Sequence, residues 1–187
     1  GSCGMPLPQV RIKLVSVEDP AREVAVGEPG ELCIKGPNVM KGYWNNPKAT
    51  AESLTPDGYF RSGDVAKMDA DGFFYIVDRT KDMLLCSGYN VYPRVIEEAI
   101  YEHPGVAEVC VIGIPDDYRG QSPKAYITLK PGALAPTLDE LKTFLKSRLG
   151  KHEMIGALEI RAELPKTAVG KLSKKDLAED EARKRAG

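Results

Sequence analysis

The segment that organises the chain reads Tyr75-Ile-Val-Asp-Arg-Thr-Lys-Asp-Met-Leu-Leu-Cys-Ser-Gly-Tyr-Asn-Val-Tyr-Pro93. It contains two short apolar runs, residues 73–77 and 83–86, and each is bounded as a buried strand would be. The charged residues between the two runs are Asp78, Arg79, Lys81 and Asp82. Because charged groups are costly to bury, we interpret this tetrad as a junction in contact with water or a polar ligand.

A turn and the start of a helix follow the junction. Residues 87–90 predict a turn in which Gly88 is free to adopt a positive φ. Pro93 is expected at the first position of a helix, where its missing N–H removes no hydrogen bond. A polar junction followed by a glycine turn suits a hinge between two moving parts. A plain surface loop between two strands is the alternative reading of these residues.

The composition is that of an ordinary globular protein with room for one full domain or two small ones in its 187 residues. The formal net charge of -1 gives no electrostatic case for binding nucleic acid or an anionic membrane. No apolar run approaches the roughly 20 residues of a transmembrane helix, and residues 1–4 do not resemble a signal peptide. The four widely spaced cysteines favour reduced thiols in a cytoplasmic protein.

Residues 1–79 predict short strands separated by turns. Residues 10–17 alternate apolar and polar side chains, as a half-buried strand does, and residues 31–35 predict a second strand. A short helix is expected to begin at Pro47. Many short strands with glycine and proline turns favour a small β-barrel or sandwich.

The sequence Arg61-Ser-Gly-Asp64 provides the first candidate for chemistry. A carboxylate held behind a glycine can accept hydrogen bonds from both hydroxyl groups of a ribose. The alternative is a turn aspartate that pairs with Arg61.

From Pro93 onward, predicted helices alternate with predicted strands. An apolar stripe at helical spacing follows Pro93, and residues 106–114 and 125–129 read as strands. Thr137 and Glu140 form a capping box at the start of the next helix. Ser173 is expected to cap a final charged helix. Residues 80–187 therefore predict a small α+β domain.

Lys171 lies on a predicted loop beside Gly170, before the final helix. An amine on a glycine-flanked loop suits a group that reaches into a cleft and neutralises developing negative charge. The alternative is an ordinary solvated lysine. His103 and His152 are read as structural, because no metal-ligand spacing and no nucleophile triad is present.

Six ordered motifs then resemble a known family. They are Gly30-Glu-Leu-Cys-Ile-Lys-Gly36, Gly42-Tyr-Trp44, Tyr59-Phe-Arg-Ser-Gly-Asp64, Asp78-Arg-Thr-Lys81, Ser87-Gly-Tyr-Asn-Val-Tyr-Pro93 and Pro165-Lys-Thr-Ala-Val-Gly-Lys171. In this order and spacing they resemble the AMP-forming acyl-CoA synthetases of the adenylate-forming superfamily. Residues 77–83 and 112–120 look most like bacterial long-chain fatty-acid–CoA ligases. The resemblance covers almost the whole chain.

The resemblance implies a reaction in two steps. A carboxylate and ATP give an acyl-adenylate and pyrophosphate, and coenzyme A then displaces AMP. By resemblance, Asp64 holds the ribose hydroxyls, Arg79 supports the same nucleotide, and Lys81 is the hinge. Residues 1–79 would be the last β-rich subdomain of the large domain, and residues 80–187 the mobile C-terminal lid domain.

Two faces of the lid are implied to act in turn. Lys171 corresponds to the lysine that contacts the reacting carboxylate and phosphate oxygens during adenylation. Gly88, Tyr89 and Asn90 correspond to the loop that lines the pantetheine tunnel during thioester formation.

Two other motifs of the family have no match in residues 1–187: the phosphate loop, and the segment whose glutamate binds magnesium. We therefore expect a C-terminal portion, inactive alone, whose partner is the missing N-terminal domain. Fatty acid, ATP/AMP, Mg²⁺ and coenzyme A would bind to the parent, with nothing held tightly by this chain and no metal ligands in it. Exposed apolar surface on residues 1–78 would accompany self-association. A stand-alone, non-catalytic nucleotide- or partner-binding module is the alternative.

Overall fold

The computed structural model describes residues 1–186, and the chain divides into two compact units, Gly1–Lys81 and Asp82–Gly187. Each unit has its own apolar core. The division falls inside the charged junction, between Lys81 and Asp82. The boundary proposed from the sequence, between residues 79 and 80, lies in the same segment.

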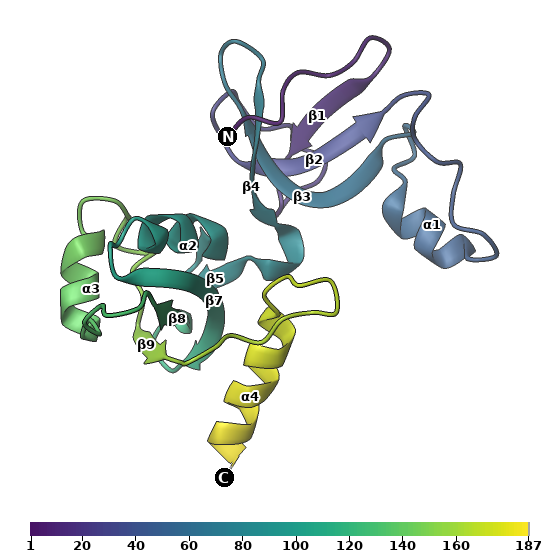
Figure 1. Cartoon of the computed structure of the whole chain (residues 1–187). Coiled ribbons are helices and arrows are strands. Elements are labelled where there is room, and N and C mark those ends of the chain that lie inside the picture. Colours follow the sequence, from purple (N-terminus) through teal and green to yellow (C-terminus); the bar gives the residue numbers. More distant parts are fainter. Residues whose placement is uncertain (187) are drawn as a thin grey trace. The chain divides into compact units, whose positions relative to one another are not determined.

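The first unit is built on an antiparallel sheet with the strand order β1-β2-β3-β4 (Figure 1). Its strands are β1 (Arg11–Val15), β2 (Gly30–Lys35), β3 (Phe60–Met68) and β4 (Phe74–Arg79). Side chains alternate between the two faces of a strand, and one face buries Leu14, Leu32, Ala66 and Phe74. A short helix, α1 (Pro47–Ser53), connects β2 to β3 and begins at Pro47 as predicted.

The expectation of a barrel or sandwich in this unit is wrong, whereas the α+β class of the chain is confirmed. Within residues 1–186 the four strands form an open sheet with β1 and β4 at its edges. A single bridge joins Gly4 to Phe74 on β4, so residues 5–10 lead from one edge of the sheet to the other. Four short strands are too few to enclose a packed interior.

The charged junction combines the end of a strand with a helical turn. β4 continues through Asp78 and Arg79, and a 3-10 turn, η1 (Thr80–Asp82), follows it. Asp78 is only 5% exposed, and its carboxylate accepts a hydrogen bond from the backbone N–H of Arg79. The expectation that the whole tetrad stays in contact with water or a polar ligand is therefore wrong for Asp78, because the Arg79 N–H takes the place of water at its carboxylate.

The second unit contains a five-stranded sheet in the order β6-β5-β8-β7, with β9 paired to β8 in parallel. Its strands are β5 (Leu84–Cys86), β6 (Tyr89–Val91), β7 (Val106–Asp116), β8 (Gly120–Leu129) and β9 (Ala157–Ile160). Its helices are α2 (Pro93–Tyr101), α3 (Leu138–Leu145) and α4 (Lys174–Ala186).

Helices cover both faces of this sheet (Figure 1). On β7, Val109 and Val111 belong to the core beneath α2 and α3, whereas Cys110 and Ile112 belong to a second cluster. The second cluster also contains Leu177 of α4. Because neighbouring strand residues point to opposite faces, the near-continuous apolar run of β7 is explained by burial on both sides.

The helix signals in this unit are confirmed. Pro93 opens α2, and Thr137 and Glu140 form both hydrogen bonds of a capping box on α3. Ser173 caps α4 by accepting a hydrogen bond from the N–H of Asp176. β7 and β8 are longer than the strands predicted at residues 106–114 and 125–129, because they pair as a hairpin from Asp116 and Gly120 onward. No helix in the described part of the chain is long and apolar enough to cross a membrane.

Candidate functional site

Asp64 and Arg79 face each other on β3 and β4. The Nε atom of Arg79 lies 3.6 Å from Oδ1 of Asp64, which is an ion pair but longer than a hydrogen bond. The Asp64 side chain is 34% exposed and that of Arg79 is 61% exposed. A carboxylate without a tight internal partner can accept hydrogen bonds from a ligand.

The backbone around Asp64 is held in place. Gly63 has a φ of +73°, a conformation that disfavours other residues. The hydroxyl of Thr80 donates to the carbonyl of Gly63 over 3.1 Å, and the N–H of Asp64 donates to Ser62 Oγ over 3.0 Å. Asp64 is therefore presented from a fixed position within β3 and not from a loose turn.

The alternative partner for Asp64 is wrong. Arg61 instead binds Glu31 on β2, with its Nε 3.0 Å from Glu31 Oε2. Glu31 is only 4% exposed, so Arg61 satisfies a buried carboxylate. The register with β2 explains this result. Arg61 pairs with Cys33, and Val65 pairs with Glu31, so Arg61 lies on the Glu31 face, whereas Asp64 directly precedes Val65 and points to the other face.

Lys81 is exposed and is the last residue of the first unit. It lies in η1, directly after the strand that carries Arg79. The predicted nucleotide and hinge residues therefore follow one another along the end of one unit.

Gly88 lies at the tip of the β5–β6 hairpin. Ser87 and Gly88 have φ values of +53° and +82° and make the turn. Tyr89 and Asn90 belong to β6, which corrects the prediction that they are turn residues. A pair of positive φ angles matches the twist of a tight hairpin.

Two residues to which the sequence analysis gave no functional role support this hairpin. The ring of His152 stacks on Tyr89 with centroids 5.0 Å apart. Arg119 accepts a hydrogen bond from Ser87 N–H through its carbonyl, and its Nη2 donates to the carbonyl of His152 over 2.6 Å. The contact of His152 with Tyr89 requires the tertiary fold, since the two residues are 63 positions apart in the sequence.

Lys171 projects from a small hairpin between β9 and α4, here called the Lys171 loop (residues 166–172). Lys166 and Leu172 pair across its base, and Gly170 has a φ of +78°. Thr167 N–H donates to the carbonyl of Lys171 over 2.7 Å. Lys171 itself is exposed, which leaves its amine open to a ligand.

The site residues thus fall into two sets. Asp64, Arg79 and Lys81 lie on the first unit, and of these Asp64 and Arg79 are in contact. Gly88, Tyr89, Asn90 and Lys171 lie on the second unit.

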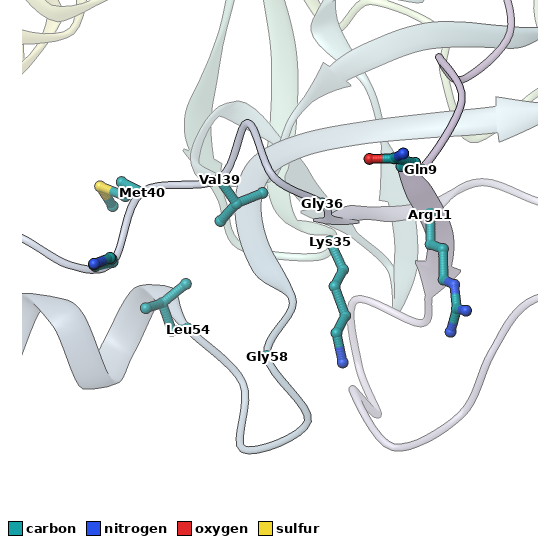
Figure 2. Close-up of a pocket in the computed structure, with 9 residues that line it drawn as sticks. Gln9, Arg11, Lys35, Gly36, Val39, Met40, Leu54 and Gly58 are labelled. Carbon is teal, nitrogen blue, oxygen red and sulfur yellow. The ribbon is translucent and has the colours of Figure 1, made fainter.

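A shallow pocket of about 510 Å³ lies elsewhere on the first unit and contains none of these residues (Figure 2). Its lining combines the cationic side chains of Arg11, Lys35 and Lys41 with apolar side chains including Val39 and Leu54.

Possible metal ligands and the buried thiol of Cys110 are the other groups considered. No group of three or more His, Cys, Asp or Glu within residues 1–186 could hold a metal ion. Burial raises the pKa of Cys110 to about 12, so its thiol stays protonated and is no nucleophile.

Two protein-family models match this chain, one in each of its two units. Residues 1–44 match the AMP-binding enzyme family, and residues 95–171 match the AMP-binding enzyme C-terminal domain. The second match contains Lys171 and ends there.

Curated relatives match along nearly the whole chain. A long-chain-fatty-acid–CoA ligase of Bacillus subtilis is 49% identical over 181 residues, which are 97% of this chain and 32% of the relative. A long-chain-fatty-acid–CoA ligase of Salmonella typhimurium is 48% identical over 183 residues, which are 98% of this chain and 32% of the relative. The chain therefore spans about a third of the length of these relatives.

Solved structures agree in fold. ATP-bound MatB from Rhodopseudomonas palustris matches with a TM-score of 0.88 and 34% identity over 96% of this chain and 35% of that protein. The o-succinylbenzoate CoA synthetase MenE from Bacillus subtilis, in complex with its acyl-adenylate intermediate, matches with a TM-score of 0.84 and 35% identity. This match covers 95% of this chain and 35% of that protein. With both family models, the ordered motifs and these relatives in agreement, the chain belongs to the adenylate-forming acyl-CoA synthetase family of AMP-binding enzymes.

Proposed function

We propose that this chain is the C-terminal portion of an ATP-dependent, AMP-forming long-chain acyl-CoA synthetase. The enzyme would join a fatty acid to AMP with release of pyrophosphate, and then transfer the acyl group to coenzyme A. AMP is a far better leaving group than hydroxide, so the first step activates the carboxylate for the second. The identity to long-chain-fatty-acid–CoA ligases supports the choice of substrate.

One observation carries this proposal. The candidate residues are divided between two compact units, and the chain passes from one unit to the other through the polar turn η1, which contains Lys81. An enzyme that performs two half-reactions by moving one unit needs nucleotide contacts on one unit, reaction-specific groups on the other, and a connection able to change its dihedral angles.

On the first unit, Asp64 would accept hydrogen bonds from the two ribose hydroxyls of ATP. Its incomplete pairing with Arg79 leaves carboxylate oxygens available for this. Arg79 would support the same nucleotide, and Lys81 would act as the hinge.

On the second unit, two separate features would serve the two steps. Lys171, exposed at the end of its loop, would stabilise the carboxylate and phosphate oxygens during adenylation. Gly88, Tyr89 and Asn90 would line the path of the pantetheine arm during thioester formation.

This chain matches about a third of the relatives' length. The groups that the reaction still needs would lie in the part of the enzyme that matches the other two thirds. We assign to that part the phosphate loop, the glutamate that binds Mg²⁺ and the pocket for the acyl chain. Much of the acceleration in such a reaction comes from positioning and charge stabilisation at the phosphates. The isolated chain would therefore be inactive.

Pyrophosphate release with ATP, Mg²⁺ and a panel of fatty acids tests this proposal, on the isolated chain and on the longer protein that contains it. We expect release by the longer protein only, with the Lys171→Ala variant at least about a hundredfold slower, since removal of one charge-stabilising group costs about 10²–10³ in rate. The Lys175→Ala variant is the control, because Lys175 is an exposed lysine of the same region on α4. Release by the isolated chain would contradict the assignment of the phosphate site. No release from either protein would favour a non-catalytic binding module.

A further inference from the structure

The tip of the Lys171 loop makes few contacts that could orient the Lys171 amine. Val169 is 79% exposed, and every residue from Lys166 to Lys171 is exposed. Hydrogen bonds within the loop connect Thr167 with Gly170 and Lys171. These bonds set the shape of the loop but not its direction, so the direction must come from the two ends of the loop.

Each end of the loop carries a lysine that binds a glutamate on another element. Lys166, at the first end, lies 2.7 Å from Glu108 on β7. Lys174, just beyond the second end, lies 3.2 Å from Glu97 on α2. The second pair is the more buried, with side chains 26% and 16% exposed. Glu97 also accepts a hydrogen bond from the N–H of Val111 on β7 over 2.8 Å.

The helix that follows the loop is itself held firmly to the sheet. Leu177 of α4 is fully buried. Three ion pairs then join α4 to β8, β9 and the residue after β9: Lys124–Glu181 at 2.7 Å, Lys184–Glu159 at 2.7 Å and Arg161–Asp180 at 3.0 Å. α4 therefore provides a fixed base for the second end of the loop.

We propose that the ion pairs Lys166–Glu108 and Lys174–Glu97 form a frame that positions Lys171 for the adenylation step. This inference rests on the proposed role of Lys171. The four residues are positioning residues and touch no substrate. A reacting group displaced by about 1 Å can lose about a hundredfold in rate, so a frame of modest stability can have a large effect on one step.

The frame predicts a selective loss. In the longer protein, Lys166→Met and Glu97→Gln should each slow pyrophosphate release by about tenfold, a part of the cost of a full 1 Å displacement. Thioester formation from supplied acyl-adenylate and coenzyme A should change less than about twofold, because Lys171 is not used there. Reversal of one pair, by Glu108→Lys together with Lys166→Glu, should restore most of the pyrophosphate release. A general loss of folding would lower both steps together.

Glu102→Gln is the matched control. It breaks an ion pair of the same unit, in which Arg148 Nε lies 2.7 Å from Glu102, away from the Lys171 loop. We expect both half-reactions to be unchanged. If Lys171→Ala abolishes pyrophosphate release but Lys166→Met and Glu97→Gln behave like this control, the proposal that the two ion pairs position Lys171 is wrong.

A measurement on the 187-residue chain separates this inference from the proposed function. Hydrogen exchange of the Gly170 and Lys171 amides, read by NMR, should be several-fold faster in Lys166→Met and Glu97→Gln than in the parent chain or in Glu102→Gln. Unchanged exchange would overturn the frame even if the enzyme is active. Faster exchange with no pyrophosphate release from the longer protein would support the frame while the proposed function fails.

Discussion

At the scale of single residues, backbone conformation and charge decide the properties of the candidate site. Asp64 is available to a ligand because Arg79 approaches it only to 3.6 Å, whereas Arg61 is committed to Glu31. Gly88 shows how one backbone angle shapes a functional loop. Within residues 1–186 an added Cβ atom would meet no atom within 4 Å, so its φ of +82°, and not crowding, favours glycine there.

Gly88→Ala should therefore destabilise the chain by about 1 kcal/mol, through backbone strain alone. Urea unfolding of the 187-residue chain measures this value. Gly88→Asn is the matched control and should lower the free energy of unfolding by a smaller amount, because asparagine tolerates the left-handed region better than alanine does. Equal losses for the two variants would show that the strain does not come from φ.

At the scale of elements, α4 is attached to the second unit by ion pairs as well as by apolar packing. Burial alone would raise the pKa of Glu159, but hydrogen bonds from Lys184, Lys124 and Arg161 lower it to about 2 from its usual 4.5. A carboxyl group with a lowered pKa in the folded state stabilises that state above its unfolded pKa. The stabilisation is lost as the pH falls from 4.5 toward 2.

Glu159→Gln should accordingly make the chain less stable at pH 7 and flatten its loss of stability between pH 4.5 and pH 2. Thermal unfolding at a series of pH values measures the slope in parent and variant. Glu163→Gln, an exposed carboxylate in the segment before the Lys171 loop, serves as the control and should leave the slope unchanged. An unaltered slope in Glu159→Gln would contradict the role of Glu159 and its ion pair with Lys184 in attaching α4.

At the scale of the whole molecule, the first unit leaves large apolar side chains on its surface. Trp44 is 91% exposed, Leu7 73% and Met5 59%. A chain that spans a third of the length of its relatives can expose surface that the remaining two thirds would cover.

We therefore expect the isolated chain to self-associate as its concentration rises. Light scattering should give an average mass above 20.4 kDa at high concentration. Trp44→Ser should shift the mass toward that of the monomer, while Tyr118→Ser, which removes a 94% exposed ring from the second unit, should not. A monomer at every concentration would contradict this expectation.

Local chemistry made several features of this protein predictable from sequence. Pro47 and Pro93 begin helices, Thr137 and Glu140 form their capping box, and Gly88 takes the turn conformation. Each of these outcomes depends on a few neighbouring residues, whose backbone preferences are known in advance. The family was also visible in the sequence, because its motifs keep their order and spacing.

Partnerships between distant residues were decided only by the tertiary structure. Arg61 binds Glu31 and not its near neighbour Asp64, Asp78 is buried, and His152 stacks on Tyr89. The sheet of the first unit stays open although its strands and turns suggested closure. Strand pairing and the faces on which side chains meet depend on contacts between residues far apart in the chain, and local preference carries no information about these contacts.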